Sequence, residues 1–466
     1  MSRITRRGFM ATTAAAAASA AFGAPAVSRR RKPNLLLIIT DQQHIETISA
    51  AGCPHVQTPW LDRLCRRGVR FDLSYSPNPL CSPARSAFLT GRTASEAGVW
   101  HNGLPIRPSV PHIGQWLAAK AGYEAIYAGK WHLPASFTTR IPGFTVLAPG
   151  VGGQGNLGDT SVSRACEAFL RNRSGNRPFL LVASFLQPHD ICQWLRLNQD
   201  DPSRLPFTEL SNELPPLPPN FRYDRREPQV VARRRESNEP GSNKGRWSEL
   251  HWRYYRWAYY RHVEMVETEA GRILQTLEGT GLDKETLVVF ISDHGEGLAH
   301  HQMVRKNNLY DEAARVPLIV SWPGHVGENV ADERHLVSPL DIMATFCDYA
   351  GVEPPKGNRG SSLRPLLEGR KTTWRDFLVS EVLDNTGRMV RTARHKLITY
   401  LGDPVEQLFD MVEDPGETRN LAAEGGAEAI RAELRKLLLE WERGLDPHPK
   451  CPHRLAWRNL LPSPTR

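Results

Sequence analysis

Short apolar runs that alternate with helical segments are the feature that most constrains the fold of this 466-residue chain. Residues 34–40 (Asn-Leu-Leu-Leu-Ile-Ile-Thr) are apolar almost throughout, which is typical of a parallel strand buried on both faces. The chain offers further candidates of both kinds, namely strands at 124–128, 179–184 and 287–292 and helices at 58–67, 113–121, 161–171 and 253–277. This alternation predicts an α/β fold with a large, mostly parallel sheet sandwiched by helices.

Ionisable side chains follow directly after four of these expected strands. They are Asp41, Lys130 with His132, His189, and Asp293 with His294. Loops that leave the carboxyl edge of an open α/β sheet form a crevice there, so side chains at these positions converge. One such residue is commonly a helix cap, a solvated charge or a core histidine, but four strand ends together predict a shared functional site.

Two regions depart from the alternating pattern. Residues 201–247 contain Pro-Pro pairs and the run Arg233-Arg234-Arg235, and we interpret about 191–250 as an insertion over the site. This insertion is either a solvated loop or a lid that contacts substrate. Beyond Gly351 the pattern becomes antiparallel, with expected strands at 377–382, 389–392 and 395–400 and a helix at 427–445. The expected domains are therefore a catalytic domain, 33–355, and a small C-terminal α+β subdomain, 356–466, with a short antiparallel sheet.

The first 32 residues have the composition of an export signal. Residues 5–10 (Thr-Arg-Arg-Gly-Phe-Met) resemble a twin-arginine motif, an alanine-rich apolar run covers 11–22, and Ala24-Pro25-Ala26 fits a cleavage site. The apolar run is too short and too weakly apolar to span a bilayer well. We therefore expect export by the twin-arginine machinery, a periplasmic or secreted protein, and no stable membrane anchor.

Charge and cysteine content narrow the classes of partner. The net charge of +9 suggests attraction to anions. No zinc-finger, RNP or helix-turn-helix pattern accompanies it, so we expect no nucleic-acid partner. Seven cysteines fit either one functional cysteine with up to three disulfides or a set of free buried thiols, and their spacing does not choose between these.

The segment Cys81-Ser82-Pro83-Ala84-Arg85, followed by residues 86–92 (Ser-Ala-Phe-Leu-Thr-Gly-Arg), carries the most specific signal. A lone cysteine before a helix is usually a small buried side chain or half of a disulfide. This segment, however, resembles the signature of type I sulfatases in the alkaline-phosphatase-like superfamily, with Ala84 where a serine is common. Further matching segments extend the resemblance over residues 34–421: Gly129 to His132, Pro188 to Asp190, Asp293 to Gly295, Lys306 to Pro317 and Leu408 to Leu421.

The resemblance implies a modified residue as the nucleophile. In this family a maturation enzyme oxidises the signature cysteine to formylglycine (3-oxoalanine), so Cys81 is expected to carry an aldehyde whose hydrated form attacks sulfur. Arg85 lies one helical turn beyond Cys81 and would steady the diol and the metal ion.

The resemblance also implies a divalent cation, usually calcium, with magnesium possible. Its expected ligands are Asp41, Gln42, the modified Cys81, Asp293 and His294. Gln42 stands where the family commonly has a second aspartate, and its amide oxygen could still bind a hard cation with one less negative charge. Imidazole is an unusual ligand for calcium, which keeps magnesium open.

The remaining catalytic roles are carried over from matching segments. Lys130 would bind sulfate or the diol oxygen, and His132 would take the second diol proton so that sulfate is released. His189 and Lys306 would bind sulfate and protonate the leaving oxygen.

We therefore expect an exported sulfatase that hydrolyses a sulfate ester, acting on a sulfated polysaccharide or oligosaccharide. One alternative is a phosphonate or phosphodiester hydrolase of the same superfamily, because both substrate classes are tetrahedral anions. Another is a non-catalytic protein that only binds sulfated glycans. The presence of a nucleophile, metal ligands and both lysines favours an enzyme.

Overall fold

Strand β1 (Asn34–Asp41) lies in the middle of the larger of two sheets. The structure, a computed structural model, describes residues 32–459 with the exception of 151–153, 199–210 and 237–246. The expected export signal and two parts of the expected insertion lie outside the described residues. From Pro33 onward the contacts group the chain into a single unit. Among the described helices, none has the length and apolar character that crossing a membrane requires.

The large sheet has eight strands in the order β4-β3-β5-β1-β6-β7-β2-β8. Strand β1 pairs in parallel with β5 and β6, β3 pairs in parallel with β4 and β5, and only β7 runs antiparallel to its neighbours β6 and β2. The remaining bounds are β2 (Gly68–Phe71), β3 (Glu124–Gly129), β4 (Thr145–Ala148), β5 (Phe179–Pro188), β6 (Thr286–Ser292), β7 (Leu318–Ser321) and β8 (Val330–Asp332). The predicted mostly parallel α/β sheet is confirmed.

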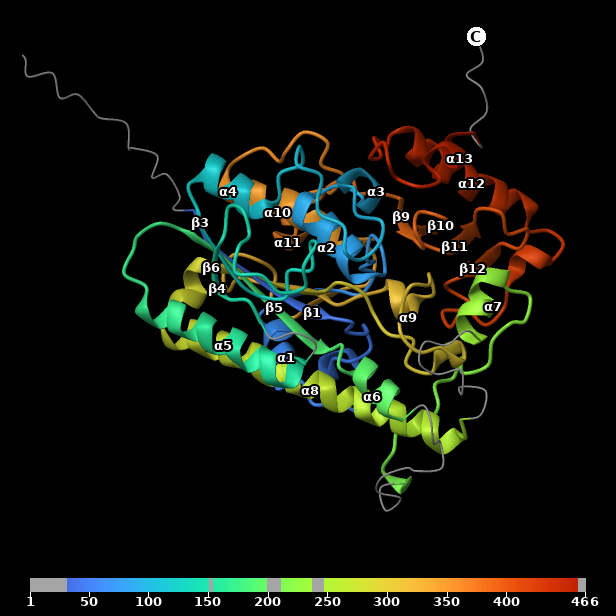
Figure 1. Cartoon of the computed structure of the whole chain (residues 1–466), viewed down its shortest axis with the longest axis horizontal. Coiled ribbons are helices and arrows are strands. Elements are labelled where there is room, and N and C mark those ends of the chain that lie inside the picture. The colour runs from blue at the N-terminus through green and yellow to red at the C-terminus, as the bar shows by residue number, and fades with distance from the viewer. Residues whose placement is uncertain (1–31, 151–153, 199–210, 237–246, 460–466) are drawn as a thin grey trace, which may run out of the picture. The chain divides into compact units, whose positions relative to one another are not determined.

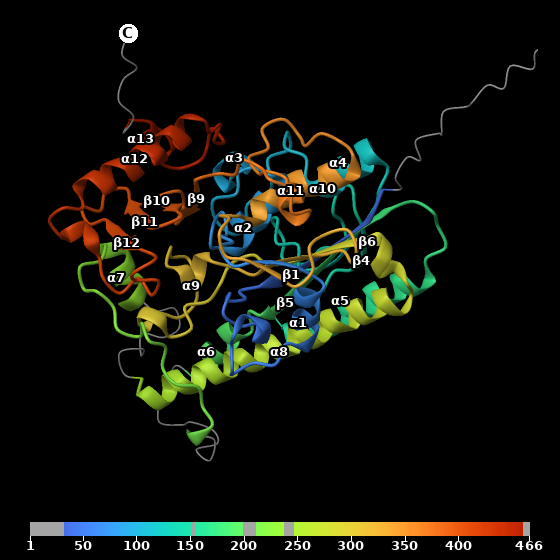
Figure 2. The same ribbon diagram turned by 180° about the vertical axis from the view of Figure 1, so that it is seen from behind.

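Helices cover both faces of this sheet, as Figures 1 and 2 show. The side chains of β1 alternate between the faces: Leu35, Leu37 and Ile39 pack in one core, and Leu36 and Ile38 pack in the other. The first core includes α2 (Cys81–Thr90), α4 (Ile113–Ala121) and α10 (Ile342–Ala350), and the second includes α1 (Pro59–Arg66), α5 (Gly155–Asn172) and α8 (Glu249–Gly279). A strand buried on both faces explains the unbroken apolar run in its sequence.

Helix α5 begins six residues before the predicted start at 161. The reason is a contact made by a distant side chain. The carboxylate of Asp190, which lies just beyond β5, accepts hydrogen bonds from the backbone N–H groups of Gly155 and Asn156 at 2.8 and 3.2 Å. A carboxylate at a helix N-terminus satisfies N–H groups that have no partner within the helix.

The C-terminal region contains a four-stranded antiparallel sheet in the order β12-β11-β10-β9. Its strands are β9 (Phe377–Val382), β10 (Gly387–Thr392), β11 (His395–Tyr400) and β12 (Gln407–Asp410), and the last of these was not among the predicted strands. Helix α12 (Glu428–Arg443) and α13 (Arg454–Asn459) pack against this sheet. The predicted short antiparallel sheet and its packing helix are thus present.

Several short helices connect the longer elements of the fold. The short helices are α3 (Ala94–Ala97), α6 (Ile191–Leu197), α7 (Gln229–Glu236), α9 (Asp311–Ala314) and α11 (Arg364–Leu367). Helix α7, in the expected insertion, is anchored: Arg235 forms a buried ion pair with Glu227 and donates to the carbonyl of His301 at 2.8 Å.

All seven cysteines lie in described residues and are free thiols, so the structure contains no disulfide among them.

Candidate active site

The strand ends that the sequence singled out meet at the carboxyl edge of the large sheet. Asp41 ends β1, Lys130 follows β3, and Asp293 follows β6. The Nζ atom of Lys130 lies 2.6 Å from Oδ2 of Asp41, and both side chains are buried. Burial alone would raise the pKa of Asp41, but the charges of Lys130, His189 and Arg85 hold it well below its usual value. Asp41 is therefore a carboxylate.

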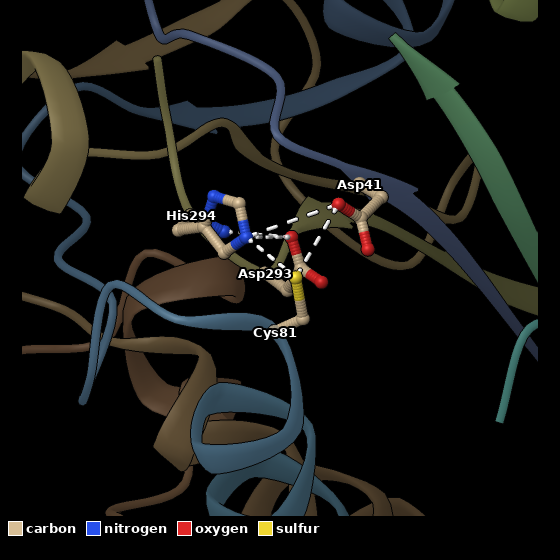
Figure 3. A group of neighbouring side chains, drawn as sticks. All are labelled: Asp41, Cys81, Asp293 and His294. Carbon is tan, nitrogen blue, oxygen red and sulfur yellow. Dashed lines mark hydrogen bonds and ion pairs between the residues drawn. The ribbon is translucent and has the colours of Figure 1, made fainter. Parts of the chain in front are cut away.

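Cys81 is the first residue of α2 and points into the same site (Figure 3). Its Sγ atom lies 3.7 Å from Oδ1 of Asp41 and 3.2 Å from Nε2 of His294. Burial and the Asp41 carboxylate would raise the pKa of this thiol, but the charges of Lys306, Lys130 and His294 hold it well below its usual value. The positive charges around Cys81 distinguish its setting from that of a cysteine buried among apolar side chains.

Arg85 joins the two aspartates from one helical turn further along α2. Its Nε donates to Oδ2 of Asp293 at 2.9 Å, and its Nη2 donates to Oδ2 of Asp41 at 3.1 Å. The third nitrogen, Nη1, donates to the carbonyl of Lys130 and to the hydroxyl of Ser184 at 2.9 and 2.8 Å. Every guanidinium nitrogen is thus engaged, which fixes the two carboxylates relative to Cys81.

The imidazole of His294 offers one nitrogen to the site. Its Nδ1 lies 2.9 Å from the carbonyl oxygen of Gly295, and because a carbonyl only accepts, Nδ1 carries a proton. Its Nε2 lies 3.5 Å from Oδ1 of Asp293 and 3.8 Å from Oδ1 of Asp41. A backbone carbonyl that orients the far nitrogen is the usual support of a metal-binding histidine.

The residues present fit a divalent cation. The ligand atoms of Asp41, Cys81, Asp293 and His294 all lie within 4.8 Å of one another, and all four side chains are buried. Burial and the neighbouring Asp41 carboxylate raise the pKa of Asp293 to about 7. Burial would lower the pKa of His294, but Asp293 and Cys81 raise it above its usual value. A bound cation would replace these protons and neutralise the paired carboxylates.

Gln42 lies in the site, but its amide oxygen faces Lys306. Its Oε1 accepts a hydrogen bond from Nζ of Lys306, and its Nε2 donates to Oε2 of Glu296. The same Nε2 lies 3.4 Å from Sγ of Cys192, and the backbone N–H of Gln42 donates to Oδ1 of Asp293 at 3.1 Å. The predicted role of Gln42 as a metal ligand stays a prediction.

Besides His294, four further cationic or imidazole side chains lie around Cys81, namely Lys130, Lys306, His132 and His189. Lys130 and Lys306 both lower the pKa of its thiol, and the side chain of His132 lies close enough for the thiol to raise the pKa of that imidazole. Burial, together with the charges of Lys306 and Lys130, holds the pKa of His189 well below its usual value. The structure therefore brings all the predicted site residues together around one thiol, in a setting that favours a tetrahedral anion.

The sequence did not single out Glu296, Ser184, Tyr255 or Cys192, which support these residues. Glu296 is completely buried and follows Asp293 by three residues in Asp-His-Gly-Glu, so its position was a signal that could have been used. The hydroxyl of Tyr255, on α8, donates a hydrogen bond to Glu296. The hydroxyl of Ser184, on β5, accepts one from Arg85. Their sequence contexts carry no comparable mark, because each meets the site only through the fold.

Comparisons with known proteins agree with this geometry. The family model described as Sulfatase matches residues 33–352, and the model described as N-sulphoglucosamine sulphohydrolase, C-terminal, matches residues 299–444. A Delta 4,5-hexuronate-2-O-sulfatase from Bacteroides thetaiotaomicron is 33% identical over 400 residues, which are 81% of this chain and 82% of that protein.

Solved structures are similar over most of both chains. A 2-O GAG sulfatase has 31% sequence identity and a TM-score of 0.80, covering 90% of this chain and 96% of the other. A phosphonate monoester hydrolase of Agrobacterium radiobacter has 25% identity and a TM-score of 0.74, covering 91% and 97%.

Proposed function

Because this chain belongs to the sulfatase family and is therefore a sulfuric ester hydrolase, we propose that its substrate is a sulfate ester on a sulfated oligosaccharide or polysaccharide. The relatives support this substrate class, since one is named for a 2-O-sulfated hexuronate and a solved neighbour for 2-O-sulfated GAG chains. The observation that carries the proposal is the position of Cys81, whose thiol lies among two aspartates, a histidine and two lysines.

We propose that Cys81 is oxidised to formylglycine by a maturation enzyme before the protein is active. When formed and hydrated, this residue would supply a diol oxygen as the nucleophile in place of the thiol. The cation that Asp41, Asp293 and His294 would hold is Ca²⁺ or Mg²⁺, and it supplies positive charge at the point where the sulfate ester reacts. Arg85 keeps the two carboxylates in place for it.

The other residues act on the sulfate group and on protons. Lys130 and Lys306 bind the sulfate oxygens, and His132, within hydrogen-bond reach of residue 81, accepts a proton there. His189 and Lys306 bind sulfate and deliver a proton to the leaving oxygen. In the unmodified protein burial would lower the pKa of Lys306, but the charges of Cys81, Cys192 and Asp41 raise it above its usual value, and Asp41 remains beside it after Cys81 is modified.

We also propose that the twin-arginine segment exports the protein to the periplasm or out of the cell. Twin-arginine export carries folded proteins, so Cys81 could meet its maturation enzyme in the cytoplasm first. Replacing Arg6-Arg7 with Lys-Lys and measuring the enzyme in periplasmic and cytoplasmic fractions tests this step. Unchanged export of the Lys-Lys variant would refute it.

The test of the activity joins peptide mass spectrometry to a substrate screen. Protein expressed with a formylglycine-generating enzyme should carry an aldehyde at residue 81 and release sulfate from 2-O-sulfated unsaturated uronate disaccharides or from related sulfated sugars. Cys81→Ala should abolish release, whereas Cys53→Ala removes a half-buried thiol elsewhere and should not. Active wild-type protein with an unmodified thiol at residue 81 would contradict the proposal.

A phosphonate or phosphodiester hydrolase is the second candidate, favoured by the solved phosphonate monoester hydrolase of similar fold. Competing turnover of an aryl sulfate and a phosphate diester separates the two, and a wide preference for the diester would replace the proposed substrate class. Sulfated-glycan binding that survives in Cys81→Ala without any wild-type turnover would instead support a non-catalytic binding protein.

A further inference from the structure

Glu296 is a buried carboxylate beside the site, and the proposed function gives it no role. Its side chain is completely inaccessible to solvent. Its two oxygens accept hydrogen bonds from Nε2 of Gln42, from the hydroxyl of Tyr255 on α8 and from the backbone N–H of Arg305. These three donors are all neutral, although burying a carboxylate is costly without a compensating charge nearby. The contact with Gln42 connects Glu296 to Lys306, because the same amide also binds the ammonium of Lys306.

The amide of Gln42 has two ends of opposite hydrogen-bonding character, and its neighbours select which end faces which. The ammonium of Lys306 can only donate, so it requires the amide oxygen. The carboxylate of Glu296 can only accept, so it requires the amide nitrogen. The amide therefore has one orientation that satisfies both, and in it the oxygen of Gln42 holds the Nζ atom of Lys306.

We propose that Glu296 is a positioning residue, which fixes the amide of Gln42 and through it the ammonium of Lys306 that receives the sulfate group. The role of Lys306 in this inference rests on the proposed function. A lysine has a flexible four-carbon stem and three rotatable donors, so a fixed acceptor is needed to keep its ammonium in one place. A cation that is already in place stabilises developing charge without reorganisation at the moment of reaction.

Two competing roles make different use of the same contacts. A purely structural role would act through Tyr255 and the backbone of Arg305, independently of Lys306. A role in metal binding would act through the orientation of Gln42 but would change cation affinity rather than sulfate affinity. The test must therefore show whether the effect of Glu296 passes through Lys306.

The central variant is Glu296→Gln, which preserves size but replaces an obligate, charged acceptor by an amide that can donate as well as accept, so Gln42 is held less firmly from its nitrogen side. Glu296→Asp is the second variant, because it keeps the negative charge while its shorter side chain falls away from Gln42. Tyr255→Phe is the matched control, since it removes a hydrogen bond from the same carboxylate without touching Gln42. Each change is made in the wild-type protein and in Lys306→Ala.

The quantities to be measured on the full-length matured enzyme are kcat and KM with a sulfate ester, the Kd for inorganic sulfate, the Kd for Ca²⁺ and the unfolding midpoint. Glu296→Gln and Glu296→Asp should each lower kcat/KM and weaken sulfate binding by about tenfold in the wild-type background and by much less than that in Lys306→Ala. Tyr255→Phe should lower the unfolding midpoint but leave sulfate affinity unchanged.

An equal loss in both backgrounds would overturn the proposal, because Glu296 would then act without Lys306. Weaker Ca²⁺ binding with unchanged sulfate binding would also overturn it, in favour of the metal role. Failure of the proposed function would look different: wild-type protein would bind inorganic sulfate but hydrolyse no sulfate ester, and the sulfate-binding comparison would still judge Glu296.

Discussion

The Nε atom of Arg85 lies 2.9 Å from Oδ2 of Asp293, and both side chains are completely buried. The same guanidinium also reaches Asp41, which Lys130 pairs with as well, so Arg85 is the cation that links the two carboxylates. Breaking a buried ion pair by removing one partner is far more costly than the pair's net contribution to stability, because it leaves an uncompensated charge. The stability of this edge of the sheet should therefore depend on Arg85.

Arg85→Met should destabilise the protein by about 3–5 kcal/mol when no divalent ion is present, as expected for loss of one partner of a buried pair. Saturating Ca²⁺ should restore part of this loss, since the cation would neutralise the same carboxylates. Urea unfolding with chelator and with Ca²⁺ measures both effects. Arg66→Met, at an exposed position of α1, is the control and should change the free energy of unfolding by less than about 0.5 kcal/mol. Equal effects of the two changes would contradict the assignment.

Cation affinity should fall as the pH is lowered below neutrality. Burial and the Asp41 carboxylate raise the pKa of Asp293 to about 7, and a metal ion requires the deprotonated form. Protons therefore compete with the ion below pH 7, and the Kd for Ca²⁺ should rise by at least about tenfold per pH unit there, because the pKa of the ligand His294 is raised as well. Calorimetric titration at pH 8, 7 and 6 measures this slope.

Asp293→Asn provides the matched control for that titration. It should weaken cation binding at pH 8, because a negative ligand is lost, and it should reduce the pH dependence, because one of the two titrating ligands is gone. Affinity in the wild-type protein that does not change between pH 8 and 6 would show that Asp293 is not a ligand.

Acid should also destabilise the fold through buried histidines. His112 is 4% exposed and stacks on Phe144 with ring centroids 5.2 Å apart, and burial lowers its pKa from 6.5 to about 4. The unfolded chain takes up a proton at higher pH than the folded one. The contribution of His112 to the free energy of unfolding is therefore fully present above pH 6.5 and is lost as the pH falls toward 4. The loss is on the order of 2–3 kcal/mol.

His112→Asn removes this titration and retains a residue suited to the start of α4. Unfolding midpoints measured from pH 7 to pH 4.5 should fall less steeply for the variant than for the wild type. Its stability at pH 7 can be lower because the stacked ring is lost, so the slope and not the level is the criterion. Parallel slopes would exclude His112 as a source of acid sensitivity.

The sequence was sufficient for the fold class because the central strands are buried on both faces, whereas β2, β4, β7 and β8 of the same sheet were not predicted. An apolar run such as Leu35 to Ile39 can be recognised without knowing which helix covers each face. The strand ends then located the site, since Asp41, Lys130 and Asp293 need only their positions after strands to be brought together. Chemistry that depends on chain order alone was therefore predictable.

Side-chain orientation and helix starts set by distant residues were not predictable in this way. The amide of Gln42 is oriented by Glu296, which lies 254 residues further along the chain, and by Lys306. Helix α5 starts at Gly155 because the carboxylate of Asp190 caps it, 35 residues away in sequence. No local pattern in the chain carries either contact, so both appear only when the fold is known.

The contact between the C-terminal sheet and the loop after Lys306 should depend on the buried ammonium of Lys396, which pairs with both Asp311 and Glu417. Lys396 on β11 is completely buried, and its Nζ lies 2.8 Å from Oδ1 of Asp311 at the start of α9. Lys396→Met should destabilise the protein by about 3–5 kcal/mol, because it leaves both Asp311 and Glu417 buried without that ammonium. Adding Asp311→Asn should recover part of that loss, since the unpaired charge is then removed as well.

Urea unfolding of the two single variants and the double variant gives the coupling energy between Lys396 and Asp311. Lys371→Met, at an exposed position, is the matched control and should change the free energy of unfolding by less than about 0.5 kcal/mol. Because α9 follows Lys306 by five residues, Lys396→Met should also raise KM for the sulfate ester, and Asp311→Asn should reduce this rise. Additive losses in the double variant would mean that the two side chains stabilise the fold independently and that the ion pair does not join the sheet to the site.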